Sequence, residues 1–158
     1  MAFEGISPIR FDSISNVTSA RGPKDPEIGS RCSYGNGDYL YVFNAGNSQA
    51  SPGQLMTVTG TTGYSATVST TTMIDHVIGV VYHSTLTTGT YGWVLTAGYG
   101  PAKAPANSGI AAGQLLTPGG DGVVAVKSIS TDAPGATIGK CVVATASAGV
   151  ATAFYKIF

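Results

Sequence analysis

The residues that most often perform chemistry in proteins are few in this chain. The two histidines are His76 and His83. On an alternating strand pattern, side chains seven residues apart point to opposite faces of a sheet. Asp75 precedes His76, but adjacent strand residues also point apart, so no carboxylate–histidine pair is expected. The chain contains no GxSxG, HExxH or Walker-type phosphate motif. We therefore expect no catalytic residue and predict that the protein is not an enzyme.

The sequence also indicates neither a metal site nor a cofactor site. Cys32 and Cys141 stand alone, without the spacing of metal ligands, and we expect small buried thiols rather than a disulfide. Residues 119–122 (Gly-Gly-Asp-Gly) resemble a calcium-binding turn but lack the repeated acidic ligands that calcium requires. A tight hairpin with Asp-Gly at its corner is the better interpretation. We predict no metal and no cofactor.

Aromatic side chains could build a sugar-binding platform. The chain has eight tyrosines and a single tryptophan, Trp93, spread over several predicted strands. Large aromatic side chains dominate protein cores and interfaces, and tyrosine and tryptophan add a polar end that forms hydrogen bonds. Because the aromatic residues are dispersed, we favour core and interface roles for them.

The charge content limits the classes of partner. The chain of 158 residues carries 8 basic and 8 acidic side chains, a net charge of zero. This balance predicts binding to neither nucleic acid nor an anionic membrane. Charged residues make up 10% of the chain, against about 25% in a typical soluble domain, so we expect partners to cover much of the surface. No apolar run approaches the length of a membrane helix, and no secretory signal is recognised, which predicts synthesis in a cytoplasm.

Strand signals dominate the chain, and no segment reads as a convincing helix. Glycine and proline together account for 22 + 8 = 30 residues, and threonine and valine are abundant. Short runs bounded by glycine-rich turns predict an all-β fold, a compact barrel or sandwich. The predicted strands are residues 39–43, 55–59, 64–69, 77–83, 91–97, 114–117, 123–128, 138–145 and 150–158.

The chain contains an internal repeat. A shift of 60 positions places residues 47–98 on residues 107–158 without a gap. The block GQLMT at 53–57 then falls on GQLLT at 113–117, and each is followed by an Ile-Gly pair and a valine-rich run. One such unit cannot bury its apolar face alone. We therefore predict two tandem similar β-modules that pair into one domain, residues 47–158.

The first 46 residues differ from this domain. Prolines at 8, 23 and 26 interrupt any regular element, yet apolar side chains recur at short intervals between residues 3 and 17. We predict an extended N-terminal arm, followed by the first strand, that orders against a neighbouring molecule. The alternative is that the arm folds back on its own domain.

Two motifs in the domain carry a family resemblance. Residues 78–98 follow the pattern Ile-Gly-Val, strand, Gly-x-Tyr-Gly-Trp-Val, strand, Gly. In the second half, Gly113-Gln-Leu-Leu-Thr leads to Gly122-Val-Val-Ala-Val and then to Ile138-Gly-Lys-Cys-Val-Val-Ala-Thr-Ala. Over residues 40–158 these patterns resemble the cement or decoration (head auxiliary) proteins of tailed bacteriophages.

This resemblance implies a capsid decoration protein that stabilises the phage head. Such a subunit is a small β-barrel or sandwich on the outer capsid surface, bridges neighbouring major capsid proteins and groups as a homotrimer. The implied location is the virion, after synthesis in the host cytoplasm, and the implied partners are the major capsid protein and the chain itself. Basic residues near the N-terminus are the candidate capsid contacts: Arg10, Arg21, Lys24 and Arg31.

Two other classes of protein fit the same sequence. A phage tail, fibre or adaptor component would also use modules rich in glycine and threonine, although a fibre would more often show several short repeats. A carbohydrate-binding adhesin module would place exposed aromatic residues on one face.

Overall fold

The computed structural model describes residues 26–35, 37–59, 64–70, 76–128, 137–146 and 149–157. Within them the protein is all-β, and one hydrogen-bonded sheet joins ten strands in the order β1-β2-β4-β3-β5-β6-β10-β9-β7-β8. None of the described helical segments is long and apolar enough to cross a membrane. The strands are β1 (Arg31–Tyr34), β2 (Gly37–Asn44), β3 (Leu55–Val58), β4 (Ser65–Val68), β5 (Val77–Val81), β6 (Tyr91–Lys103), β7 (Leu115–Pro118), β8 (Val124–Val126), β9 (Gly139–Val143) and β10 (Val150–Lys156).

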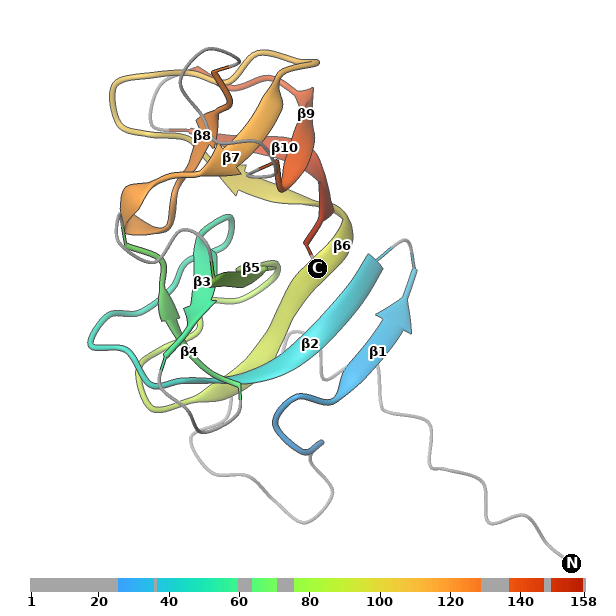
Figure 1. The fold of residues 1–158 in the computed structure, drawn as a ribbon, viewed down its shortest axis with the longest axis vertical. Coiled ribbons are helices and arrows are strands. Elements are labelled where there is room, and N and C mark those ends of the chain that lie inside the picture. The colour runs from blue at the N-terminus through green and yellow to red at the C-terminus, as the bar shows by residue number, and fades with distance from the viewer. Residues whose placement is uncertain are drawn as a thin grey trace, which may run out of the picture.

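The first half of the sheet closes on itself. Besides its pairing with β4, strand β2 pairs antiparallel with β6, which joins β2, β4, β3, β5 and β6 into a closed five-strand barrel. We call this barrel the first unit; it lies in the lower part of Figure 1. Its interior is a cluster of fully buried aliphatic side chains that alternate with outward-facing residues along each strand. The cluster includes Leu40, Val42, Met56, Val81 and Val94.

The second half of the sheet stays open. Strand β6 is long enough to continue beyond the barrel, and its C-terminal part pairs with β10. The sheet then runs through β9 and β7 to β8, which pairs with β7 alone among the described residues. We call the C-terminal part of β6 (97–103) together with β7–β10 the second unit. In Figure 1, β6 runs from the barrel into this unit.

The two units share one hydrophobic core. The larger buried cluster contains Leu116, Cys141 and Tyr155 of the second unit, and it also contains Leu55 and Leu95 from the wall of the barrel. Apolar burial of this kind is the main favourable term in folding. The continuous cluster therefore makes the closed and open halves parts of one domain.

The hydrogen bonds of the two units repeat at an interval of 60 residues. Gly53 N donates to Val81 O over 2.8 Å, and Gly113 N donates to Cys141 O over 2.9 Å. Both glycines have positive φ, 89° and 86°, a conformation that other residues rarely adopt. The bridge between Ala50 and Leu86 has a counterpart between Ile110 and Thr145, which is shifted by one residue on its second strand. The turns that precede β3 and β7 therefore have the same local backbone geometry.

The predicted all-β fold class is confirmed, and all nine predicted strands are present. Eight of them lie within two residues of their expected ends, whereas β6 extends six residues beyond the predicted end at residue 97. The predicted hairpin at 119–122 is a short 3-10 turn between β7 and β8, with Asp121 at φ 56° and Gly122 at φ 72°. Strand β1 was not predicted. It pairs with β2 across the Gly35 turn, so residues 31–44 form a hairpin on the sheet.

Candidate functional site

The two ends of the ten-strand sheet are edge strands. Strand β1 pairs with β2 and strand β8 with β7, and no other described strand pairs with either. An edge strand presents unpaired backbone N–H and C=O groups, which makes it a template for another chain. Three of the four β1 side chains are exposed. The β1 edge and the surface beside it are therefore the first candidate contact site.

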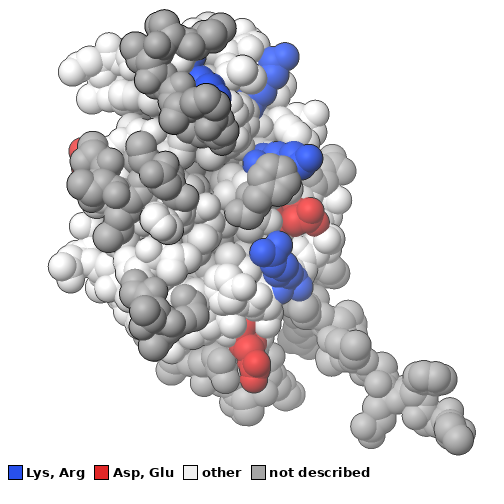
Figure 2. Space-filling view, in the orientation of Figure 1, with Lys and Arg blue, Asp and Glu red and all other residues white. Residues whose placement is uncertain are grey.

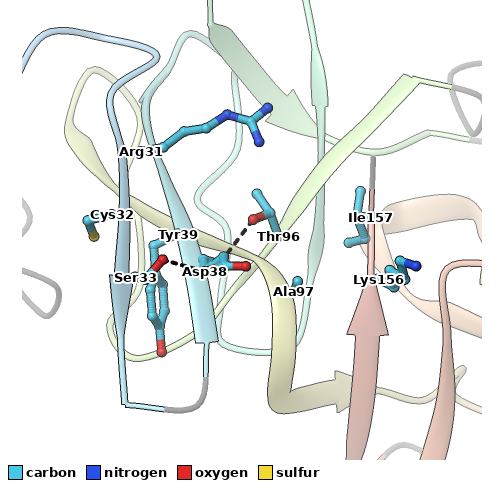
Figure 3. Close-up of a pocket in the computed structure, with 9 residues that line it drawn as sticks. All are labelled: Arg31, Cys32, Ser33, Asp38, Tyr39, Thr96, Ala97, Lys156 and Ile157. Carbon is cyan, nitrogen blue, oxygen red and sulfur yellow. Dashed lines mark hydrogen bonds between the residues drawn. The ribbon is translucent and has the colours of Figure 1, made fainter.

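A pocket of about 490 Å³ opens beside the β1–β2 hairpin. Figure 3 shows that its walls come from three places in the chain: the hairpin, the middle of β6 and the end of β10. Its charged side chains are Arg31, Asp38 and Lys156, and Ile157 supplies an apolar surface. The register shift in the β2–β6 pairing, between Asp38 and Tyr39, lies beside this pocket.

Hydrogen bonds fix the polar centre of the pocket. Ser33 Oγ donates to Asp38 Oδ1 over 2.6 Å, and Thr96 Oγ1 donates to the backbone oxygen of Asp38 over 3.0 Å. These two bonds hold Asp38 in place at the centre of the pocket (Figure 3). Two basic side chains and one carboxylate among the lining residues leave the pocket with a net positive charge. This arrangement suits a carboxylate from a partner, because a guanidinium and an ammonium both donate to such a group.

The reactive groups of the pocket are held in their neutral forms. Burial, and next the negative charge of Asp38, raise the pKa of the Cys32 thiol. Burial, and next the neighbouring Tyr82, raise the pKa of Tyr39 to about 12. The rings of Tyr39 and Tyr82 meet edge to face, with centroids 5.5 Å apart. A nucleophilic cysteine needs a lowered pKa, so this geometry favours binding over covalent chemistry.

Of the four predicted capsid contacts, the structure places one. Arg31 begins β1, is exposed and lines the pocket. Arg10, Arg21 and Lys24 lie outside the described residues, and so does the predicted arm before residue 26.

The remaining chemical candidates are dispersed. His76 and His83 are both exposed, at the two ends of β5, and neither lines the pocket. Across the described ranges no group of three or more His, Cys, Asp or Glu side chains is placed to hold a metal ion. Cys32 and Cys141 are free thiols. Trp93, Tyr39 and Tyr155 are buried in the core.

Sequence reasoning missed most of the pocket. Asp38, Thr96 and Lys156 are far apart along the chain, and only the pairing of β2, β6 and β10 brings them together. One signal was present: residues 35–38 (Gly-Asn-Gly-Asp) are typical of a tight turn, and such a turn implies a strand before it as well as after it. That strand is β1.

Few charges mark the rest of the surface. Among the described residues in Figure 2, isolated basic and acidic side chains stand on a surface of uncharged ones. The exposed large apolar side chains are concentrated in the second unit, where they include Tyr99, Leu115, Val143, Val150 and Phe154. Exposed apolar groups gathered on one region of a surface mark contact sites.

Comparison with known proteins gives a similarity of fold. No family model matches the chain, and no curated protein matches it. A solved structure described as the head fiber gp8.5 N base of bacteriophage phi29 has a similar fold, with a TM-score of 0.52 and 20% sequence identity. The match covers 75% of this chain and 92% of that structure. At this identity the similarity establishes a shared fold.

Proposed function

We propose that this protein is a structural subunit of a bacteriophage virion, a cement or decoration protein on the outer surface of the head. In this role it binds the major capsid protein, strengthens contacts between neighbouring capsid subunits and assembles as a homotrimer. It is made in the host cytoplasm and acts without a cofactor.

The observation that carries this proposal is the fold shared with a head-attached phage protein, the phi29 head fiber base. The proposal is supported independently by the sequence motifs in residues 78–98 and 113–146, which resemble those of head decoration proteins. Two exposed sheet edges and a charge content of 10% suit wide, nearly neutral contacts. Weak contacts of this kind give firm attachment when many copies bind one lattice.

The test is binding of the purified chain to phage heads that lack it. The expected result is co-sedimentation with the heads, saturating at a copy number in the hundreds, and greater resistance of the decorated heads to heat or osmotic shock. A chain that stays at the top of the gradient at all concentrations contradicts the proposal. Light scattering of the free chain measures the proposed trimer.

The basic N-terminal residues give a narrower hypothesis within this function. Arg10, Arg21, Lys24 and Arg31 pair with acidic side chains of the capsid. Removal of residues 1–25 together with Arg31→Ala should weaken head binding and flatten its salt dependence, because fewer ion pairs remain to be screened. Unchanged occupancy of the heads contradicts this hypothesis. Removal of residues 1–25 alone separates the contribution of Arg31.

A second candidate function follows from the same structural neighbour. The chain could be the base of a fibre or adaptor on the virion, because the neighbour is the base of a head fiber. A fibre base binds few sites per head and carries an elongated partner. Electron microscopy of labelled virions distinguishes the two functions, since decoration covers the lattice evenly and a fibre base gives sparse projections.

A further inference from the structure

One face of the sheet in the second unit is exposed. It is formed by the outward side chains of four neighbouring strands, β6 (97–103), β10, β9 and β7. Along β10 exposed and buried residues alternate strictly, so this sheet has one face in the core and one face outside. We call the outside surface the outer face. Its large side chains are Tyr99, Leu115, Lys140, Val143, Val150 and Phe154.

The register places these side chains in rows across the strands. Leu115 lies opposite Lys140, Lys140 opposite Phe154, and Phe154 opposite Tyr99. The rings of Tyr99 and Phe154 meet edge to face, with centroids 5.1 Å apart. Tyr99 is nevertheless 51% exposed and Phe154 42% exposed. Directly opposite residues on one sheet face contact each other. The row is therefore an apolar strip that is interrupted by one ammonium group, that of Lys140.

A groove extends the outer face toward the first unit. Its volume is about 490 Å³, and its lining includes Tyr99 and Val150 of the outer face together with Tyr82 and His83. The strip therefore ends in a hollow that could receive a protruding side chain. Binding sites are usually concave, mostly apolar surfaces with a few polar groups.

The charge of the outer face has one sign. Lys140 lies in the apolar strip, Lys103 lies opposite Val150, and Lys156 ends the exposed row of β10. No aspartate or glutamate occurs on the outer face of the four strands. A complementary surface would present apolar side chains with carboxylates placed to meet the lysines.

A second copy of this face is a poor occupant. In a twofold pair the same patch meets itself, which would bring the lysines of one copy against those of the other. The face is also small. Four strands about 4.8 Å apart and about 20 Å long cover roughly 400 Å², well below the roughly 800 Å² per partner of a stable pair. Such an area suits a contact repeated many times on a lattice.

We propose that the outer face is the surface with which this protein docks on the head shell, against an apolar patch of the shell protein that is bordered by carboxylates. This inference rests on the proposed function and names the contact surface within it. Leu115, Phe154 and Tyr99 supply the apolar contact, and Lys140 pairs with a carboxylate of the shell.

Head binding of a paired set of variants tests this docking. The double variant Lys140→Glu with Phe154→Ala alters the outer face. The control, Gln49→Glu and Thr88→Glu with Tyr64→Ala, makes the same change of net charge and also removes an exposed aromatic ring, at exposed positions of the first unit. The affinity of the outer-face variant for heads should fall at least about tenfold, which corresponds to about 1.4 kcal/mol. The control should bind within about twofold of the wild-type protein.

A labelling measurement checks the same contact in the unmodified protein. Lys140 should be protected from acylation when the protein is bound to heads and should label readily in the free protein. Circular dichroism establishes that each variant is folded before its binding is measured.

The outcomes separate the two proposals. If the wild-type protein binds heads and the outer-face and control variants bind them with equal affinity, the outer-face inference is overturned and the proposed function stays in place. Labelling of Lys140 in the bound state has the same consequence. Absence of wild-type binding to heads overturns the proposed function and this inference with it. Self-association lost in the outer-face variant alone would assign the face to a second copy and would also overturn the inference.

Discussion

The first and second units have equivalent turns and pairings but end in different states: one is a closed barrel and the other an open sheet. In the first unit β2 pairs with both β4 and β6. In the second unit the C-terminal part of β6 stands in the place of β2 and pairs with β10, but β8 pairs with β7 alone in the described structure. The same turn geometry therefore occurs in a closed and in an open arrangement. We call the place where the end of β2 meets β4 the seam, and a few residues there decide between the two arrangements.

Two sequence differences at the seam explain the open unit. In the barrel, Ala45 N donates to Ala66 O over 2.9 Å, and this bond ties the end of β2 to β4. The residue 60 positions later is Pro105, which has no N–H to donate. Beside Ala45, the fully buried Asn44 side chain bonds three backbone groups, whereas its counterpart is Ala104. The second unit therefore lacks both the bond that ties the end of β2 to β4 and the buried amide that holds the chain just after β2.

The closed and the open unit differ in which equivalent side chains are buried. Leu55 and Leu115 occupy the same place in the repeated block, the first residue of β3 and of β7. Leu55 is fully buried, because it packs in the core shared by the units, whereas Leu115 is 45% exposed. The closed unit thus uses its outward residues for internal packing, and the open unit leaves the matching positions free for a partner.

The largest difference between the units should appear when these two leucines are truncated. Leu55→Ala should lower the free energy of unfolding by about 3 kcal/mol, because it removes a fully buried side chain and leaves a cavity. Leu115→Ala should change the free energy of unfolding by less than about 0.5 kcal/mol, because the side chain is at the surface. Denaturant unfolding followed by fluorescence measures both values. Equal losses would contradict the assignment of Leu115 to an open face.

The next prediction concerns the buried amide of Asn44 at the end of β2. Asn44 Nδ2 donates to Leu86 O over 2.9 Å and to Ser48 O over 3.1 Å, and Asn44 Oδ1 accepts from Gly46 N over 3.1 Å. Asn44→Ala should lower the free energy of unfolding by about 2 kcal/mol, because buried backbone groups lose their partners. The same denaturant measurement applies. A loss below about 0.5 kcal/mol would show that water replaces the amide and that Asn44 does not hold the seam.

Introducing the proline of the second unit into the first should weaken the closure directly. Ala45→Pro removes the N–H that bonds Ala66 O, and the expected loss is about 1 kcal/mol or more. Ala45→Ser keeps the N–H at this exposed position and should be close to neutral. Hydrogen exchange gives a local readout: amides of β4 should exchange faster in the proline variant, and amides of β9 should not. Unchanged exchange in β4 would mean that Ala45 is not needed for closure.

Much of this fold could be predicted from sequence, but its asymmetry could not. Turn glycines and alternating valines located nine strands, and the GQLxT block revealed the repeat, because local backbone chemistry is readable from residue type. The role of Pro105 was not readable, since its significance depends on which strand would have paired there. The pocket around Asp38 was missed for the same reason, because β2, β6 and β10 meet only through long-range pairing.

The glutamine of the repeated block supplies the last and smallest comparison. Gln54 Oε1 accepts from Ser51 N over 2.8 Å, and Gln114 Oε1 accepts from Ala111 N over 2.7 Å. Gln54 alone adds a bond between the units, from its Nε2 to Asp121 O over 3.0 Å.

Each glutamine-to-alanine change should therefore cost about 1 kcal/mol for the shared turn bond. Gln54→Ala should cost a few tenths of a kcal/mol more than Gln114→Ala, because it also removes a bond between the units at an exposed position. Thermal unfolding of the two variants, measured side by side, resolves such a difference. If Gln114→Ala costs as much as Gln54→Ala, the contact with Asp121 adds nothing, and the shared hydrophobic core and the bonds of Ser69 to Gly119 and Gly122 join the closed unit to the open one.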